Sequence, residues 1–219
     1  MITYALVKPA HPYQVLEFLT AGSRSPYREW LDGLDMTVRA RIQARILRFE
    51  TSNLGNHRAV GDGVCESRLD FEPGIASISG SRERRSLCCS EAETSGPRSE
   101  ISEVPRQIGR TTWRSVMARR SKDWNEGLAQ DLRDVEFARE FIVAGIEEGV
   151  SLQAILSKVV RAYGVREFSK KIRMASPNVL RAISPKHNPT QQTLDRLLRP
   201  FGLRLSVKAI AASPKKRAA

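Results

Sequence analysis

The feature that most constrains this chain is a basic stretch near its C-terminus, residues 165–207, in which short helical patterns follow one another. From residue 165 to the end of the chain, 13 lysines and arginines stand against only Glu167 and Asp195, so this part carries a net charge of +11 out of the +12 of the whole chain. A compact helical unit of this polarity is suited to the phosphate backbone of DNA. The predicted helices cover residues 165–173, 177–183 and 191–199.

The remaining charge is divided unevenly between the two halves. Residues 1–116 carry 16 basic and 14 acidic side chains, whereas residues 117–219 carry 20 and 10. This difference indicates two modules with different partners.

Composition restricts the environment of the protein. Apolar residues make up 41% of the chain, which is typical of a soluble globular protein, and no apolar run approaches the ~20 residues that cross a bilayer. The N-terminus has no apolar segment typical of a signal peptide. The three cysteines include the adjacent pair Cys88 and Cys89 and fit no disulfide framework. We therefore expect a cytoplasmic protein without a membrane partner.

The N-terminal half shows a mixed pattern of strands and helices. Residues 13–20 are apolar, β-branched or aromatic and predict a strand, after which Ser25 and Pro26 open a helix. A second helix is predicted over residues 36–50 from its apolar stripe. A hairpin turn at Asp62 and Gly63 leads into an alternating strand, residues 64–71.

Residues 75–116 have no sustained helical or strand period and are rich in Ser, Arg, Glu and Gly. Such a segment buries too little apolar surface to offset the entropy of ordering it. The sequence therefore predicts a disordered linker of about 40 residues.

Helical periodicity returns after Met117. Residues 121–130 are predicted to form a helix, Asp134 caps a second, and Ser151 caps a third that stops at Gly164. The basic helices follow, and then a short strand, residues 203–207. The fold class is thus α+β overall, with an all-helical, helix-turn-helix C-terminal part.

The middle basic helix is the candidate recognition helix. Ser176 is expected to cap it, and Pro177 to fill its first turn. Asn178 and Arg181 carry end groups suited to adenine and guanine edges. The alternative is a small helical domain whose basic face is only solvated, and the concentrated charge favours DNA. The residues expected to hold phosphates are Arg173, Ser176, Lys186, His187, Asn188 and Gln191.

A longer motif runs through the basic helices. It has the pattern LxRAxSPxxNPTxxTLxxLLxxxGLRLxV, which this sequence meets at Leu180, Arg181, Ser184, Pro185, Asn188, Pro189, Thr190, Thr193, Leu194 and residues 203–207. Through this motif, residues 117–207 resemble HigA-like antidote proteins, the antitoxins of type II toxin–antitoxin pairs. The resemblance implies a homodimer that binds its own operator DNA and neutralises a RelE/HigB-like toxin, and Met117 stands where such an antitoxin normally begins.

The N-terminal half carries its own set of short motifs, namely Ser25-Pro26, Glu29-Trp30-Leu31, Asn53-Leu54-Gly55, Gly63-Val64, Glu66, Arg68 and Asp70-Phe71. With these motifs, residues 13–74 are similar to HigB-like toxins of the RelE/ParE superfamily, small α+β proteins that cleave messenger RNA on the ribosome. The family continues with two core strands, a glycine- and lysine-bearing loop and a closing helix, and residues 75–116 contain none of these patterns. The resemblance therefore implies a truncated remnant, a partial α/β sandwich of two helices and short antiparallel strands. A frameshift across residues 75–116 is our interpretation of the break.

No catalytic residue, metal site or cofactor is predicted. His11, His57 and His187 are scattered, with no acidic or cysteine partner at metal-ligand spacing. Arg68 stands where the toxin family carries a strand arginine implicated in RNA contact, but its neighbouring strands are missing from the pattern.

The predicted organisation is a toxin remnant (residues 1–74), a linker (75–116), an antitoxin-like DNA-binding domain (117–210) and a basic tail (211–219). The expected function is operator binding and repression of a toxin–antitoxin locus. Two alternatives remain open. One is an active ribonuclease kept silent by its fused antidote, and the other is an interaction module that binds a toxin through residues 134–163 without binding DNA.

Overall fold

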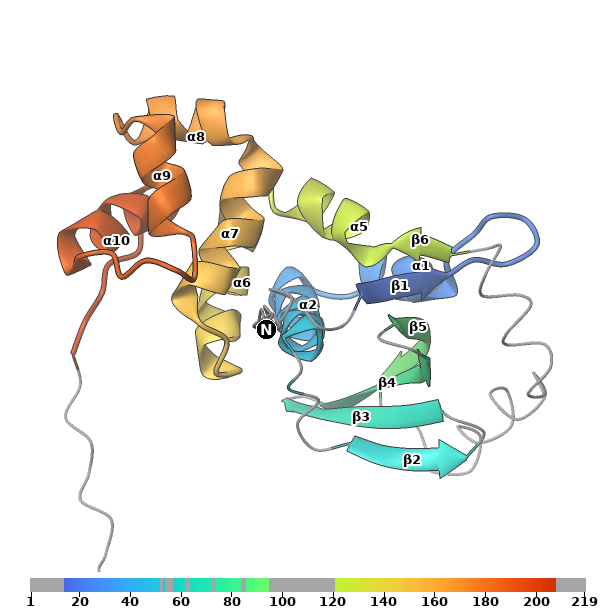
Figure 1. The fold of residues 1–219 in the computed structure, drawn as a ribbon. Coiled ribbons are helices and arrows are strands. Elements are labelled where there is room, and N and C mark those ends of the chain that lie inside the picture. The colour runs from blue at the N-terminus through green and yellow to red at the C-terminus, as the bar shows by residue number, and fades with distance from the viewer. Residues whose placement is uncertain are drawn as a thin grey trace, which may run out of the picture.

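The computed structural model describes residues 14–51, 53, 57–61, 64–71, 74–83, 86–94 and 121–207. Helices and strands are both present, which confirms a mixed α+β chain (Figure 1). The elements are β1 (Gln14–Phe18), α1 (Pro26–Asp32), α2 (Met36–Glu50), β2 (His57–Gly61), β3 (Val64–Phe71), β4 (Gly74–Glu83), β5 (Ser86–Thr94), β6 (Ser121–Asp123), α5 (Trp124–Asp131), α6 (Val135–Glu147), α7 (Leu152–Tyr163), α8 (Val165–Lys171), α9 (Ser176–Ala182), α10 (Gln191–Leu198) and the 3-10 helix η1 (Arg199–Phe201).

The described strands form one sheet with the order β2-β3-β4-β5-β1-β6. All neighbours are antiparallel except β1 and β5, which run parallel with Leu16 opposite Cys88. The hairpin predicted from Asp62 and Gly63 is confirmed by the antiparallel pairing of β2 with β3, although these two turn residues lie outside the described part.

The prediction of a linker is wrong for residues 75–83 and 86–94, which lie in β4 and β5 in the middle of the sheet. A central strand receives backbone hydrogen bonds from both neighbours, and these bonds do not require alternation of apolar side chains. Two strands therefore form in a segment whose Ser- and Arg-rich composition gave no strand pattern. The rest of the predicted linker, residues 95–116, lies outside the described residues and stays a prediction.

Local signals set the N-terminal helices as expected. The Ser25 hydroxyl accepts a hydrogen bond from the Arg28 backbone N–H at 3.1 Å, and Pro26 stands in the first turn of α1. α2 has the predicted bounds, and Asp35 caps it by accepting from the Thr37 N–H at 2.8 Å.

The C-terminal helices also follow their capping signals. Asp134 accepts from the N–H groups of Glu136 and Phe137, and Ser151 accepts from that of Ala154. Gly164 has a φ of +85°, which a glycine adopts at no steric cost, and α7 stops there.

Three local predictions in this half are wrong. Residues 121–123 pair with β1 as β6, so the helix starts only at Trp124, with Asp123 as its cap. Ala175, and not Ser176, takes the N-cap position of α9. Residues 203–207 form no strand, and the Leu205 N–H donates instead to the Asp195 carboxylate at 2.7 Å.

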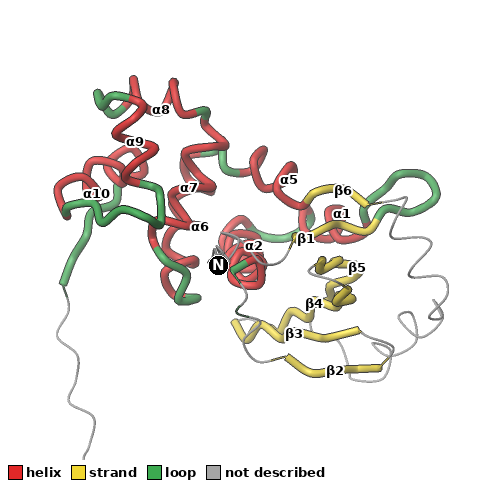
Figure 2. Tube along the Cα trace, viewed as in Figure 1, coloured by secondary structure: helices red, strands yellow, loops and turns green. Residues whose placement is uncertain are grey.

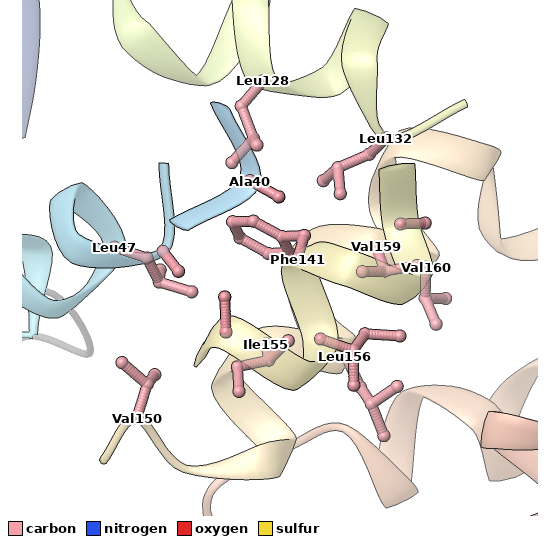
Figure 3. Packing of buried hydrophobic residues seen from close by; sticks show 14 of the residues in the cluster. Ala40, Leu47, Leu128, Leu132, Phe141, Val150, Ile155, Leu156, Val159 and Val160 are labelled. Carbon is pink, nitrogen blue, oxygen red and sulfur yellow. The ribbon is translucent and has the colours of Figure 1, made fainter. Parts of the chain in front are cut away.

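One continuous apolar core joins the two halves (Figure 3). Ala40 and Leu47 of α2 are buried with Phe141 of α6, while α7 contributes Ile155 and Leu156. The helices α8 to α10 lie on the side of the molecule away from β2 to β5, with α6 and α7 between (Figures 1 and 2). The two predicted modules therefore share a core, and the basic helices stand at its far end.

Candidate nucleic-acid interface

The surface of α9 and the loop that follows it form a concavity of about 410 Å³. Four predicted DNA-binding residues meet there. Asn178 and Arg181 come from α9, while His187 and Asn188 come from the loop between α9 and α10, and all four are exposed. The concavity thus exposes amide, guanidinium and imidazole groups together, and such groups can form hydrogen bonds to base edges and phosphates.

The other four predicted residues do not line this concavity. Arg173, Lys186 and Gln191 are exposed, whereas Ser176 is half-buried in the first turn of α9. Arg173 lies in the turn before α9, and Gln191 is the first residue of α10. They are placed around the site and remain accessible to a long ligand.

The described part of the chain offers no acidic partner to the basic side chains of this region. Within the part of the chain that the structure describes, no carboxylate lies within ion-pairing distance of any lysine or arginine between residues 165 and 207. One of the two acidic side chains there, Asp195, accepts from the Leu205 N–H. The residues concerned are Arg166, Lys170, Lys171, Arg173, Arg181, Lys186, Arg196, Arg199 and Arg204.

Arginines of α1 and α2 behave differently. Arg28 forms two hydrogen bonds to Asp131 of α5, at 2.6 and 2.9 Å, and Gln43 donates to the same carboxylate at 2.5 Å. Arg45 and Arg48 each lie 3.1 Å from Glu148. These three arginines of α1 and α2 are thus each paired with a carboxylate of the C-terminal half.

Burial changes the proton affinity of two groups at this contact. Burial alone lowers the pKa of Arg28, but its hydrogen bonds and attraction to Asp131 outweigh that effect and raise the pKa above its ordinary value. Burial raises the pKa of Glu17, and a hydrogen bond from Ser25 together with the charge of Arg28 opposes the rise. Arg28 therefore stays charged, whereas ionisation of Glu17 is disfavoured in the folded protein.

A further ion pair between the halves has its cation in the C-terminal half, on Lys158 of α7. Its ammonium group lies 2.6 Å from the buried carboxylate of Glu50 on α2 and also donates to Asn125 of α5. The contact between the halves thus combines the apolar core with ion pairs in which either half supplies the cation.

Several residues of the concave site were not among the predicted DNA-binding residues. Thr190 and Thr193 line it, and the Thr190 hydroxyl caps α10 by accepting from the Thr193 N–H at 3.3 Å. A threonine directly before a helical pattern is a capping signal that locates Thr190. Arg196 also lines the site. Its hydrogen bonds to the turn between α8 and α9 are visible only in the structure.

Leu180 is a further side chain that the periodicity did not single out. It lies on α9 with 43% of its surface exposed and lines a second concavity with Lys158 and Arg161 of α7. An exposed apolar side chain on such a helix can contact a thymine methyl group.

No protein-family model, curated protein or solved structure matches this chain. Among the described helices, none combines the length and apolar character needed to cross a membrane. In the same described residues, no group of three or more His, Cys, Asp and Glu side chains is arranged to hold a metal ion.

Proposed function

We propose that this chain binds DNA sequence-specifically through α9 and represses transcription of its own toxin–antitoxin locus from the cytoplasm. In this role Asn178 and Arg181 read base edges, and Arg173, Ser176, Lys186, His187, Asn188 and Gln191 hold phosphates on either side. The bound form is a homodimer on an operator, because that is what the resemblance to HigA-like antitoxins implies.

One observation carries the proposal. The basic residues of α8 to α10 have no carboxylate partners among the described residues, while α1 and α2 direct Arg28, Arg45 and Arg48 to carboxylates of α5 and α6. Cations without carboxylate partners on one small helical unit repel each other unless a polyanion neutralises them. DNA supplies that charge, and the amide of Asn178 and guanidinium of Arg181 supply hydrogen-bonding groups for base edges.

The test starts from a pool of randomised DNA duplexes. The full-length chain is used to select bound duplexes, and affinity for the enriched sequence is measured by gel shift at several salt concentrations. We expect an enriched sequence and a logarithmic salt slope of about −0.9 for each phosphate contacted. Asn178→Ala and Arg181→Ala should each cost about 1–3 kcal/mol of specific binding. Arg133→Ala, which removes an exposed arginine outside α8 to α10, is the matched control.

Binding without any enriched sequence, or equal binding by all four proteins, would refute the proposal. The absence of DNA binding altogether would favour an interaction module that holds a toxin without DNA.

A second candidate function follows from the contact between the halves. If the N-terminal half is a RelE/HigB-type ribonuclease, α5 to α7 cover its helices α1 and α2 and keep it silent. The buried Arg28–Asp131 and Lys158–Glu50 pairs support this alternative, because they hold the halves together. Asp131→Arg places like charges together and should release the contact. Messenger RNA loss and growth arrest on expression of this variant, but not of the native chain, would support it, and their absence would count against it.

A further inference from the structure

The helix α9 is held in place by groups from other elements. It has only seven residues, and its N-cap residue, Ala175, provides no side-chain hydrogen bond. Helices of this length are not stable alone in water. Val179 and Ala182 bury its inner face in the core, and the direction of α9, with the position of Asn178 and Arg181, also depends on what fixes its two ends.

The turn before α9 is fixed by Arg196 of α10. α8 ends with the Met174 N–H bonded to the Ser169 carbonyl at 3.0 Å and the Arg173 N–H bonded to the Lys170 carbonyl at 3.2 Å, and Arg173 has a φ of +51°. These features define a Schellman motif, which leaves the next carbonyl groups without helical partners.

The guanidinium of Arg196 donates to those carbonyl groups. Its Nε donates to the Ile172 carbonyl at 2.9 Å, and its Nη2 donates to the Arg173 carbonyl at 2.7 Å. A planar fork that binds two successive carbonyls fixes the direction of the turn more closely than a single ammonium group does.

The other end of α9 is fixed by Gln153 of α7. Its Nε2 lies 3.3 Å from the Ala182 carbonyl, 3.0 Å from the Ser184 carbonyl and 2.7 Å from the His187 carbonyl. These carbonyls belong to the last turn of α9 and the loop that carries the predicted phosphate contacts. Because α7 is anchored in the core by Ile155 and Leu156, Gln153 ties the loop to a rigid element.

We propose that Arg196 and Gln153 are positioning residues for DNA recognition. They hold the two ends of α9 so that Asn178 and Arg181 reach the base edges together, and this inference rests on the proposed function of α9. Hydrogen bonds to bases weaken steeply with misalignment, so loss of either support should reduce sequence-specific binding more than phosphate binding.

The experiment compares Arg196→Lys and Gln153→Leu with two matched controls in the full-length chain. Arg196→Lys keeps the charge but loses the fork, and Arg199→Lys makes the same change at an exposed arginine of η1. Gln153→Leu removes the amide at similar volume, and Gln192→Leu does so at an exposed position of α10. The probes are the duplex enriched by the native chain and a scrambled duplex of equal length.

We expect each test variant to bind the enriched duplex about tenfold more weakly, as the loss of one base contact would cause. Binding to the scrambled duplex and the salt slope should stay as in the native chain, because the number of phosphate contacts is unchanged. The controls should match the native chain on both probes. If Gln153→Leu does not unfold cooperatively on heating, Gln153→Asn, whose amide is one methylene shorter, takes its place.

The results separate this inference from the proposed function. An enriched duplex bound equally by native chain and variants overturns the positioning role alone. Equal loss of affinity for both duplexes, or a changed salt slope in Arg196→Lys, assigns Arg196 to phosphate binding and also overturns it. Failure of the native chain to enrich any duplex overturns both proposals.

Discussion

Replacement of Arg173 by glycine tests the fold of the basic helices and their proposed function by two independent measurements. Arg173 occupies the left-handed position of the turn between α8 and α9, with a φ of +51°. A residue with a Cβ atom loses roughly 1–2 kcal/mol in this conformation, and glycine does not. Glycine also makes the unfolded chain more flexible, which costs about 0.4–1 kcal/mol. We therefore expect Arg173→Gly to stabilise the protein by about 0.5–1 kcal/mol.

DNA binding, in contrast to stability, should become weaker in Arg173→Gly. If Arg173 holds a phosphate, its removal makes the logarithmic salt slope shallower by about 0.9 and weakens binding to all duplexes alike. The carbonyl of residue 173 that accepts from Arg196 is still present in the variant, so the turn itself should persist.

Two measurements test these expectations. The thermal midpoint should rise by about 1–4 °C for a chain of this size, and gel shifts at several salt concentrations give the slope. Arg173→Ala is the control, because it removes the same charge but keeps the backbone strain. It should make the logarithmic salt slope shallower by the same amount, without raising the thermal midpoint. A lower midpoint for Arg173→Gly than for Arg173→Ala would refute the turn geometry, and an unchanged slope would refute the phosphate contact.

Three further predictions concern the core and the contact between the halves. Asp131→Ala should destabilise the chain by about 1.5–3 kcal/mol in denaturant unfolding, because it removes both hydrogen bonds that join the half-buried Arg28 guanidinium to α5, and Arg28 then keeps only the half-exposed Asp32 as a carboxylate partner among the described residues. Asp32→Ala, which removes that half-exposed partner instead, should cost under about 1 kcal/mol. Burial raises the pKa of Glu17, so ionising this carboxyl at pH 7 opposes folding. Glu17→Gln should therefore raise the thermal midpoint at pH 7, and this advantage should disappear as the pH falls through the raised pKa towards about 4.5. Equal gains at both pH values would contradict that assignment. A Cβ atom at Gly145 would lie 2.7 Å from Cδ1 of Ile155, so Gly145→Ala should cost about 1–3 kcal/mol, and adding Ile155→Val, which lacks that atom, should restore part of the loss.

Helix ends were the most predictable part of the chain. Ser25, Asp134, Ser151 and Gly164 mark real helix ends, and α2 has the predicted bounds. A cap depends on a side chain and backbone groups within about four residues, so the information is local in the sequence.

The strands β4 and β5 were not predictable in the same way. Their backbone groups pair with β3 and β1, and the parallel pairing brings residues 14–17 next to residues 86–89. No local pattern encodes such a pairing when the alternation of apolar and polar residues is weak.

The concentration of positive charge and the helical pattern of residues 165–207 were evident from the sequence alone, as were the candidate base-reading residues Asn178 and Arg181. Which of the cations lack a carboxylate partner was decided only by the tertiary structure, because α5 and α6 supply Asp131 and Glu148 to distant arginines. The same is true of Arg196 and Gln153, whose hydrogen bonds reach carbonyls more than 20 residues away in the chain. Charge and helical period are properties of the residues themselves, whereas pairing and support depend on which residues packing brings together.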